Sequence, residues 1–134
     1  MSCKGIKNFF PKCVISEYNN VGDFFLTIAD MFTVDVIIVE HNLPLVKVKP
    51  DFEEQFEKFN TLFPEVVKDW TRHVAGEKIV RHLRGVGMLT PVIIYIHGDE
   101  HFIARDVMHY TNVAYCMKEI EVEELITLIR TFVK

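Results

Sequence analysis

Two aliphatic runs restrict the possible folds of this chain more than any other feature. Residues 34–40 read VDVIIVE and residues 90–97 read TPVIIYIH, so each run is almost continuously apolar. Continuous runs of this length are typical of strands that are covered on both faces, as in a parallel sheet that lies between helices. Two further segments, 13–18 and 113–118, are short and rich in β-forming residues, and we predict that they are also strands.

Helical patterns alternate with these strands. Apolar side chains recur at helical spacing in four segments, which are residues 21–32, 75–87, 99–111 and 121–134. Gly85 and Gly87 supply a stop for the second of these helices. Because strands that alternate with helices form right-handed βαβ units, the sequence predicts an α/β fold with an open parallel sheet of about four strands.

One segment, residues 46–72, departs from this alternation. It contains a helical pattern with phenylalanines on one face and acids on the other, followed by Pro64 at the expected first position of a second short helix. We interpret the segment as a helical insertion after the second strand, within a single domain that spans residues 1–134. We interpret the phenylalanine face as core cover rather than a partner groove. The candidates for contact with a partner are Phe52, Phe56, Phe59 and Tyr115.

Composition argues against several classes of function. The formal net charge of −4 does not suit a protein that wraps a phosphate backbone, so no nucleic-acid partner is expected. No apolar run approaches the ~18 residues of a membrane span, so no membrane association is expected. Cys3, Cys13 and Cys116 form neither a disulfide framework nor a CxxC pair, which indicates a cytoplasmic protein. The glycine-rich motifs that hold nucleotides are missing from the sequence, and no cofactor is expected.

Polar residues that follow the strands mark the candidate site. In an open parallel sheet, ligands bind outside the carboxyl ends of the strands. Glu40 and His41 follow the aliphatic run of residues 34–39, His97 ends the next strand and Lys118 ends the last one. We therefore expect these side chains to share one edge of the sheet.

Three stretches of the chain resemble successive parts of a response-regulator receiver domain. The first stretch, VISEYNNVGDFFLTIADMFTVDVIIVEHNLP, resembles the second strand, second helix and third strand of that family. The second stretch, AGEKIVRHLRGVGMLTPVIIYI, resembles the family's third helix and fourth strand. The third stretch, NVAYCMKEIEVEELITLIRTF, resembles the family's fifth strand and last helix. The resemblance covers roughly residues 13–44 and 75–134. It implies a flavodoxin-like, receiver-like fold and a role in two-component signalling.

The residues of the family's phosphorylation site are altered in this chain. The resemblance places Glu40 at the phospho-accepting aspartate, Ile96 at the switch Thr or Ser, and Lys118 at the family's lysine. Glutamate is not the usual phospho-acceptor in this family. Isoleucine has no hydroxyl group that could respond to a phosphoryl group on the acceptor. We interpret Glu40 as a remnant of the site that pairs with Lys118 at the sheet edge. A fixed imitation of the phosphorylated state is the alternative.

The Mg²⁺-binding part of the family is incomplete as well. Twelve residues precede Cys13, which is too few for the first strand and helix that carry the family's acidic pair. An alternative alignment takes residues 13–18 as the first strand, with Ser16 and Glu17 at the acid-pair positions, and then lacks the second strand and helix. At most one metal-holding acid remains under either alignment. The resemblance therefore implies a phosphorylation-independent pseudo-receiver that acts by protein–protein contact and is not an enzyme.

A second class of function stays open. His41, His97 and His101 are candidate metal ligands, because imidazole and carboxylate groups bind zinc. Gly98 breaks the helical register between His97 and His101, and no HExxH motif or cysteine pair supports the site. Polar loop residues are the preferred interpretation. A small metal-binding protein or enzyme that uses the strand-end Glu, His and Lys cluster is the alternative.

We also expect the protein to form homo-oligomers. A parallel sheet that lacks a strand and a helix of its family exposes a strand edge or an apolar face, and proteins normally cover both. The receiver resemblance makes residues 99–134 a second candidate surface, since that family often dimerises through the corresponding elements.

Overall fold

The computed structural model describes residues 3–26, 34–40, 43–45, 52–68, 75–96, 110–117 and 122–133. These residues form an α/β fold in which helices alternate with parallel strands, as the sequence predicts. In chain order the elements are α1 (Cys3–Phe9), α2 (Val21–Leu26), β1 (Ile37–Glu40), α3 (Phe52–Leu62), α4 (Pro64–Val67), α5 (Ala75–Gly85), β2 (Val92–Ile96), β3 (Val113–Met117) and α7 (Val122–Phe132).

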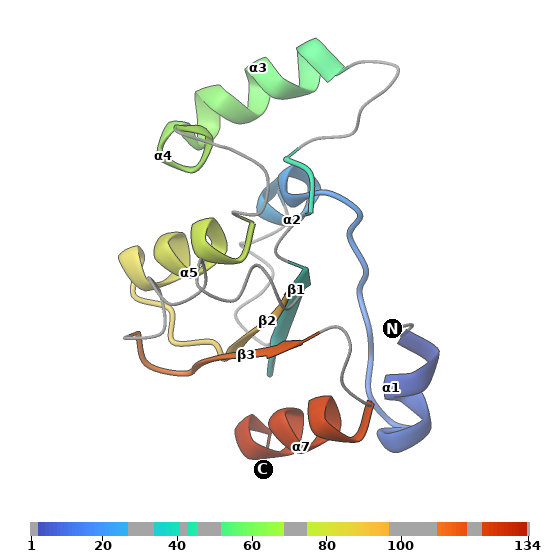
Figure 1. The fold of residues 1–134 in the computed structure, drawn as a ribbon. Coiled ribbons are helices and arrows are strands. Elements are labelled where there is room, and N and C mark those ends of the chain that lie inside the picture. The colour runs from blue at the N-terminus through green and yellow to red at the C-terminus, as the bar shows by residue number, and fades with distance from the viewer. Residues whose placement is uncertain are drawn as a thin grey trace.

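The strands form an open, all-parallel sheet in the order β1–β2–β3 (Figure 1). Ile37 of β1 lies opposite Val92 of β2. Because successive residues of a strand point to opposite faces, β2 contributes Val92 and Ile94 to one core and Ile93 and Tyr95 to the other. Helices α2 and α5 cover the first face of the sheet, and α1 and α7 cover the second.

The strand predicted for residues 13–18 is wrong, and among the described residues the sheet has three strands rather than four. The segment has no regular secondary structure, and the side chain of its Val14 is 93% exposed. A strand is stable where its N–H and C=O groups form hydrogen bonds with a neighbouring strand. No described strand pairs with this segment. A high content of β-forming residues was therefore not sufficient here.

Helix α1 is an element that the sequence analysis does not predict. Its Ile6 and the following Phe10 pack against the core that α7 covers. The guanidinium carbon of Arg130 in α7 lies 5.6 Å from the centre of the Phe10 ring, which is a cation–π contact. The N-terminal residues thus help to close the second face of the sheet.

A side-chain cap fixes the start of α2. The Asp23 N–H donates to Asn20 Oδ1 at 2.8 Å, and Asn20 Nδ2 donates to Asp23 Oδ2 at 2.9 Å. Asn20 is only 1% exposed, so these bonds satisfy a polar side chain that is removed from water. The first bond is that of an N-cap side chain to a backbone N–H three positions along the chain, and the second bond joins the two side chains.

Helix α5 ends as its glycines predict. Gly87 has a φ of 84°, in the left-handed region that glycine adopts readily. The Gly87 N–H donates to the Arg84 carbonyl at 3.2 Å, and the Met88 N–H donates to the Leu83 carbonyl at 2.9 Å. This pair of bonds is the Schellman motif, which satisfies carbonyls at the helix end.

Arg84 ties the end of α5 to the amino edge of the sheet. Its guanidinium group donates to the carbonyls of Met88 at 2.8 Å and Thr90 at 3.0 Å, both of which precede β2. It also donates to the carbonyls of Thr111 at 2.8 Å and Asn112 at 3.3 Å, which precede β3. One side chain therefore holds three segments of the chain together.

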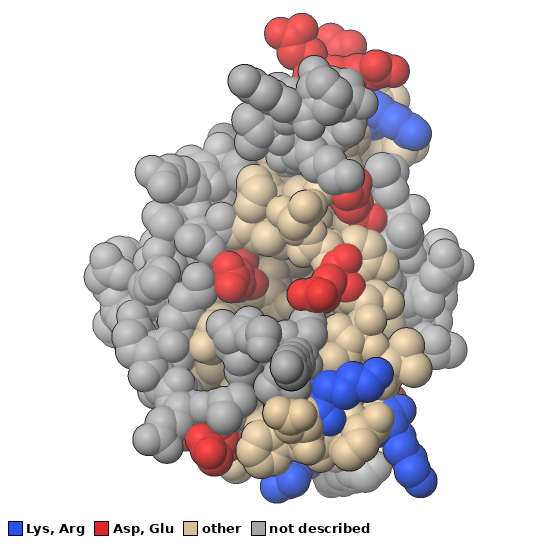
Figure 2. Space-filling model, turned by 90° about the vertical axis from the view of Figure 1, so that its right-hand side faces the viewer, with Lys and Arg blue, Asp and Glu red and all other residues tan. Residues whose placement is uncertain are grey.

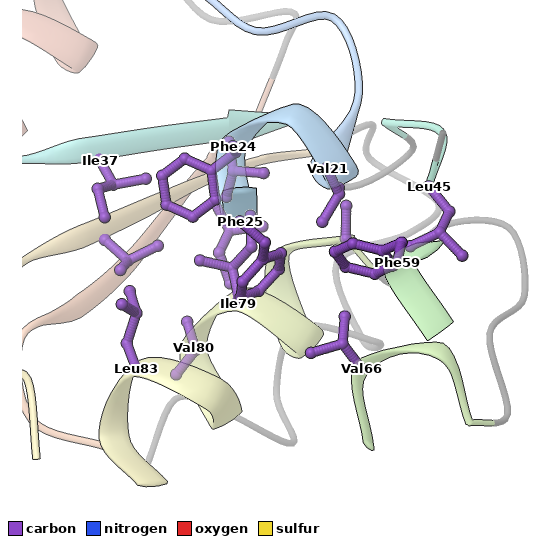
Figure 3. Close-up of a cluster of buried hydrophobic side chains, with 14 residues drawn as sticks. Val21, Phe24, Phe25, Ile37, Leu45, Phe59, Val66, Ile79, Val80 and Leu83 are labelled. Carbon is purple, nitrogen blue, oxygen red and sulfur yellow. The ribbon is translucent and has the colours of Figure 1, made fainter. Parts of the chain in front are cut away.

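The insertion is helical in its described part and docks on the larger core, which is the one that α2 and α5 form with the first face of the sheet (Figure 3). Phe59 of α3 and Val66 of α4 are 1% and 3% exposed, and they belong to the same cluster as Val21 of α2. The Phe59 ring lies 5.8 Å from the Phe25 ring and 5.2 Å from the Phe63 ring, measured between centroids. The phenylalanine face is therefore core cover, as we predict.

This burial corrects the set of candidate contact residues. Phe59 is wrong as an interaction candidate, because its buried side chain cannot reach a partner. Phe56 is half-buried and packs against the same core, while the side chain of Phe52 lies outside the described part of the structure. Tyr115 is 39% exposed and stays a candidate.

His82 of α5 packs against two phenylalanine rings, and we expect it to make stability depend on pH. The His82 ring centre is 4.8 Å from that of Phe25 and 5.5 Å from that of Phe63, and both contacts are edge-to-face. Burial lowers the pKa of His82 from its usual 6.5, so the folded state favours the neutral ring. The stability from this group is present above the unfolded pKa of 6.5 and is lost as pH falls toward the lower folded pKa.

The measurement is the urea midpoint at about pH 7.5 and about pH 5.5, on either side of the histidine titration. The decrease between the two should be larger in the parent protein than in His82→Gln, whose side chain does not titrate. Equal decreases in the two proteins would contradict this prediction.

Candidate functional site

Strand β1 carries Glu40 to the carboxyl edge of the sheet. Glu40 is the last residue of β1, lies opposite Tyr95 of β2 and is half-buried. The Leu43 N–H donates to the Glu40 carbonyl at 3.1 Å, so residue 43 lies against the end of the strand. A carboxylate group thus stands where open parallel sheets bind their ligands.

The segment 43–45 is bound to the start of α2. The N–H groups of Val21 and Gly22 donate to the carbonyls of Pro44 and Leu45 at 2.9 and 2.6 Å. These N–H groups belong to the first turn of a helix and have no acceptor within it. The edge is therefore assembled from the end of β1, the segment 43–45 and the start of α2, which Asn20 caps.

The structure describes part of the predicted site. His41, His97, His101 and Lys118 lie outside the described residues. The proposed ion pair between Glu40 and Lys118 and the histidine group therefore stay predictions.

Ile96 is the last residue of β2, where it pairs with Met117 of β3. Its side chain is outside the described part of the structure, but its backbone lies at the same edge of the sheet as Glu40. The resemblance aligns Ile96 with the family's switch residue. The position at a strand end is thus as the sequence predicts.

In the residues that the structure describes, nothing supports a metal site or a nucleophilic role for Cys116. Among them, no three His, Cys, Asp or Glu side chains come together as a metal site. Cys116 is 3% exposed, and burial raises the pKa of its thiol to about 11, with the negative charge of Glu124 adding to the rise. The thiol is protonated at neutral pH, whereas a nucleophile requires the thiolate. Cys116 is therefore a core side chain.

Two structural groups escaped the sequence analysis. The capping pair Asn20 and Asp23 has a readable signal, because an Asn three residues before an acid at a helix start is a capping pattern. Arg84 has no local signal, since one of its acceptors lies 28 residues away in the sequence. From the sequence, Arg84 is recognisable only as a basic residue in the last turn of a helix.

Of the helices in the described residues, none has both the length and the apolar character that crossing a membrane requires. No family model matches the chain, no curated protein matches it significantly, and no solved structure does so either.

Proposed function

We propose that this chain is a receiver-like domain of flavodoxin-like topology that acts by protein–protein contact, without a phosphorylation cycle. The observation that carries the proposal is Glu40, an acid at the carboxyl end of the first of three sequential parallel strands. The receiver resemblance aligns this position with the phospho-acceptor. The family assignment rests on analogy of sequence pattern and strand order, and the loss of phosphorylation rests on the positions that the resemblance assigns to Glu40 and Ile96.

Phosphorylation signalling of the receiver type uses three groups that this sequence alters. They are a carboxylate that attacks the phosphoryl group, which is an aspartate in that family, a bound Mg²⁺ that neutralises the phosphoryl charge, and a hydroxyl group that responds to the product. Glu40 and Ile96 stand in place of the first and third groups. Within the residues that the resemblance covers, at most one acid of the Mg²⁺-binding pair is present. A receiver-like domain with these changes would act through contact with a partner and not through a phosphorylation switch.

The distribution of charge supports a role in contact. Glu53, Glu54 and Glu57 of α3 are exposed, and so are Lys7 and Lys12 at the end of α1 and in the turn that follows. Figure 2 shows acidic side chains at the end of the molecule where α3 lies, and most of the visible Lys and Arg side chains at the opposite end. Complementary charge speeds and orients association, so a basic partner surface suits the α3 end.

We expect the protein to remain unmodified by small phosphodonors. Incubation with acetyl phosphate and Mg²⁺ should leave its intact mass unchanged, and beryllofluoride with Mg²⁺ should leave its thermal melting temperature unchanged. The reason is that Glu40 and Ile96 replace the acceptor and the switch residue. Mass spectrometry that found a hydroxylamine-labile phosphoryl adduct would contradict the proposal.

Two controls sharpen this experiment. The Glu40→Asp variant restores the usual acceptor, and it should also stay unmodified because the residues that the resemblance covers keep at most one acid of the Mg²⁺-binding pair. Metal analysis of the purified parent protein tests the other class of function. Stoichiometric zinc or iron would replace the contact-domain proposal by a metal protein that uses the strand-end histidines.

Self-association stays a prediction that light scattering can check. Among the described residues, β1 is an edge strand of three aliphatic residues and Glu40, with β2 as its one neighbour. Because unpaired edges favour pairing with another chain, we expect a mass above that of the monomer at high micromolar concentration. A monomer mass under those conditions would count against it.

A further inference from the structure

We draw no further inference here: the strongest candidate, the outer edge of β1 in the three-stranded sheet, pairs with no described strand, and nothing in the described residues shows what covers it.

Discussion

Replacing Phe59 by alanine should lower the free energy of unfolding by about 3–5 kcal/mol, the usual cost of emptying a core aromatic site. Phe59 is 1% exposed and contacts the rings of Phe25 and Phe63. The substitution therefore removes the side chain that joins α3 to the core under α2 and α5. Urea denaturation and a thermal melt measure the loss directly.

Leu62→Ala is the matched control, because Leu62 lies in the same helix and is 54% exposed. Its effect should stay within about 0.5 kcal/mol, as is usual for surface positions. Phe56→Ala should fall between the two, since Phe56 is half-buried. If Phe59→Ala left the urea midpoint unchanged, the insertion would not contribute to the core, and its phenylalanines would have to serve a partner.

Loss of the Arg84 side chain should cost about 2–3 kcal/mol, because carbonyl groups that it satisfies would lose a charged donor. The guanidinium group of Arg84 bonds to Met88 and Thr90 before β2 and to Thr111 and Asn112 before β3. Arg84→Ala removes all of these bonds at once. Arg84→Lys should recover less than half of the stability, since a single ammonium group cannot span acceptors that a planar fork reaches.

Arg81→Ala separates this effect from the loss of any arginine in α5. Arg81 is exposed and forms an ion pair with Glu77, in which Arg81 Nε lies 2.9 Å from Glu77 Oε1. Exposed pairs of this spacing contribute about 0.3–0.5 kcal/mol, so the variant should melt close to the parent protein. Equal losses from Arg81→Ala and Arg84→Ala would show that the carbonyl contacts of Arg84 do not stabilise the fold.

The parts of the fold that the sequence predicts are those with a strong local pattern. The aliphatic runs around Ile38 and Ile94 form strands in their expected places, and the Gly87 stop ends α5. The amphipathic pattern of α3 gives both the helix and the face that it buries. In each case the pattern that predicts the element lies within the residues of that element and its immediate neighbours.

The failures share a different cause, which is dependence on distant partners. Residues 13–18 have the composition of a strand but no described strand to pair with, so composition misled the prediction. Arg84 looks like an ordinary residue of a helix end, and its role arises from loops that only the folded sheet brings near. At the candidate site, the end of β1 predicts the place of Glu40. The backbone bonds from α2 to Pro44 and Leu45 have no counterpart in the sequence pattern.

Strand order also bears on how the chain assembles during synthesis. Among the described strands, β2 lies beside β1 and β3 lies beside β2, so the spatial order of the strands is their order in the chain. No described strand has to insert later between two strands that are already paired. Most of the larger core, from α2 through β2, can close before β3 and α7 leave the ribosome. The opposite face keeps Ile93 and Tyr95 uncovered by α7 until that last helix emerges. A chain stalled before α7 would therefore present an apolar sheet face, and a chaperone should bind the nascent protein there.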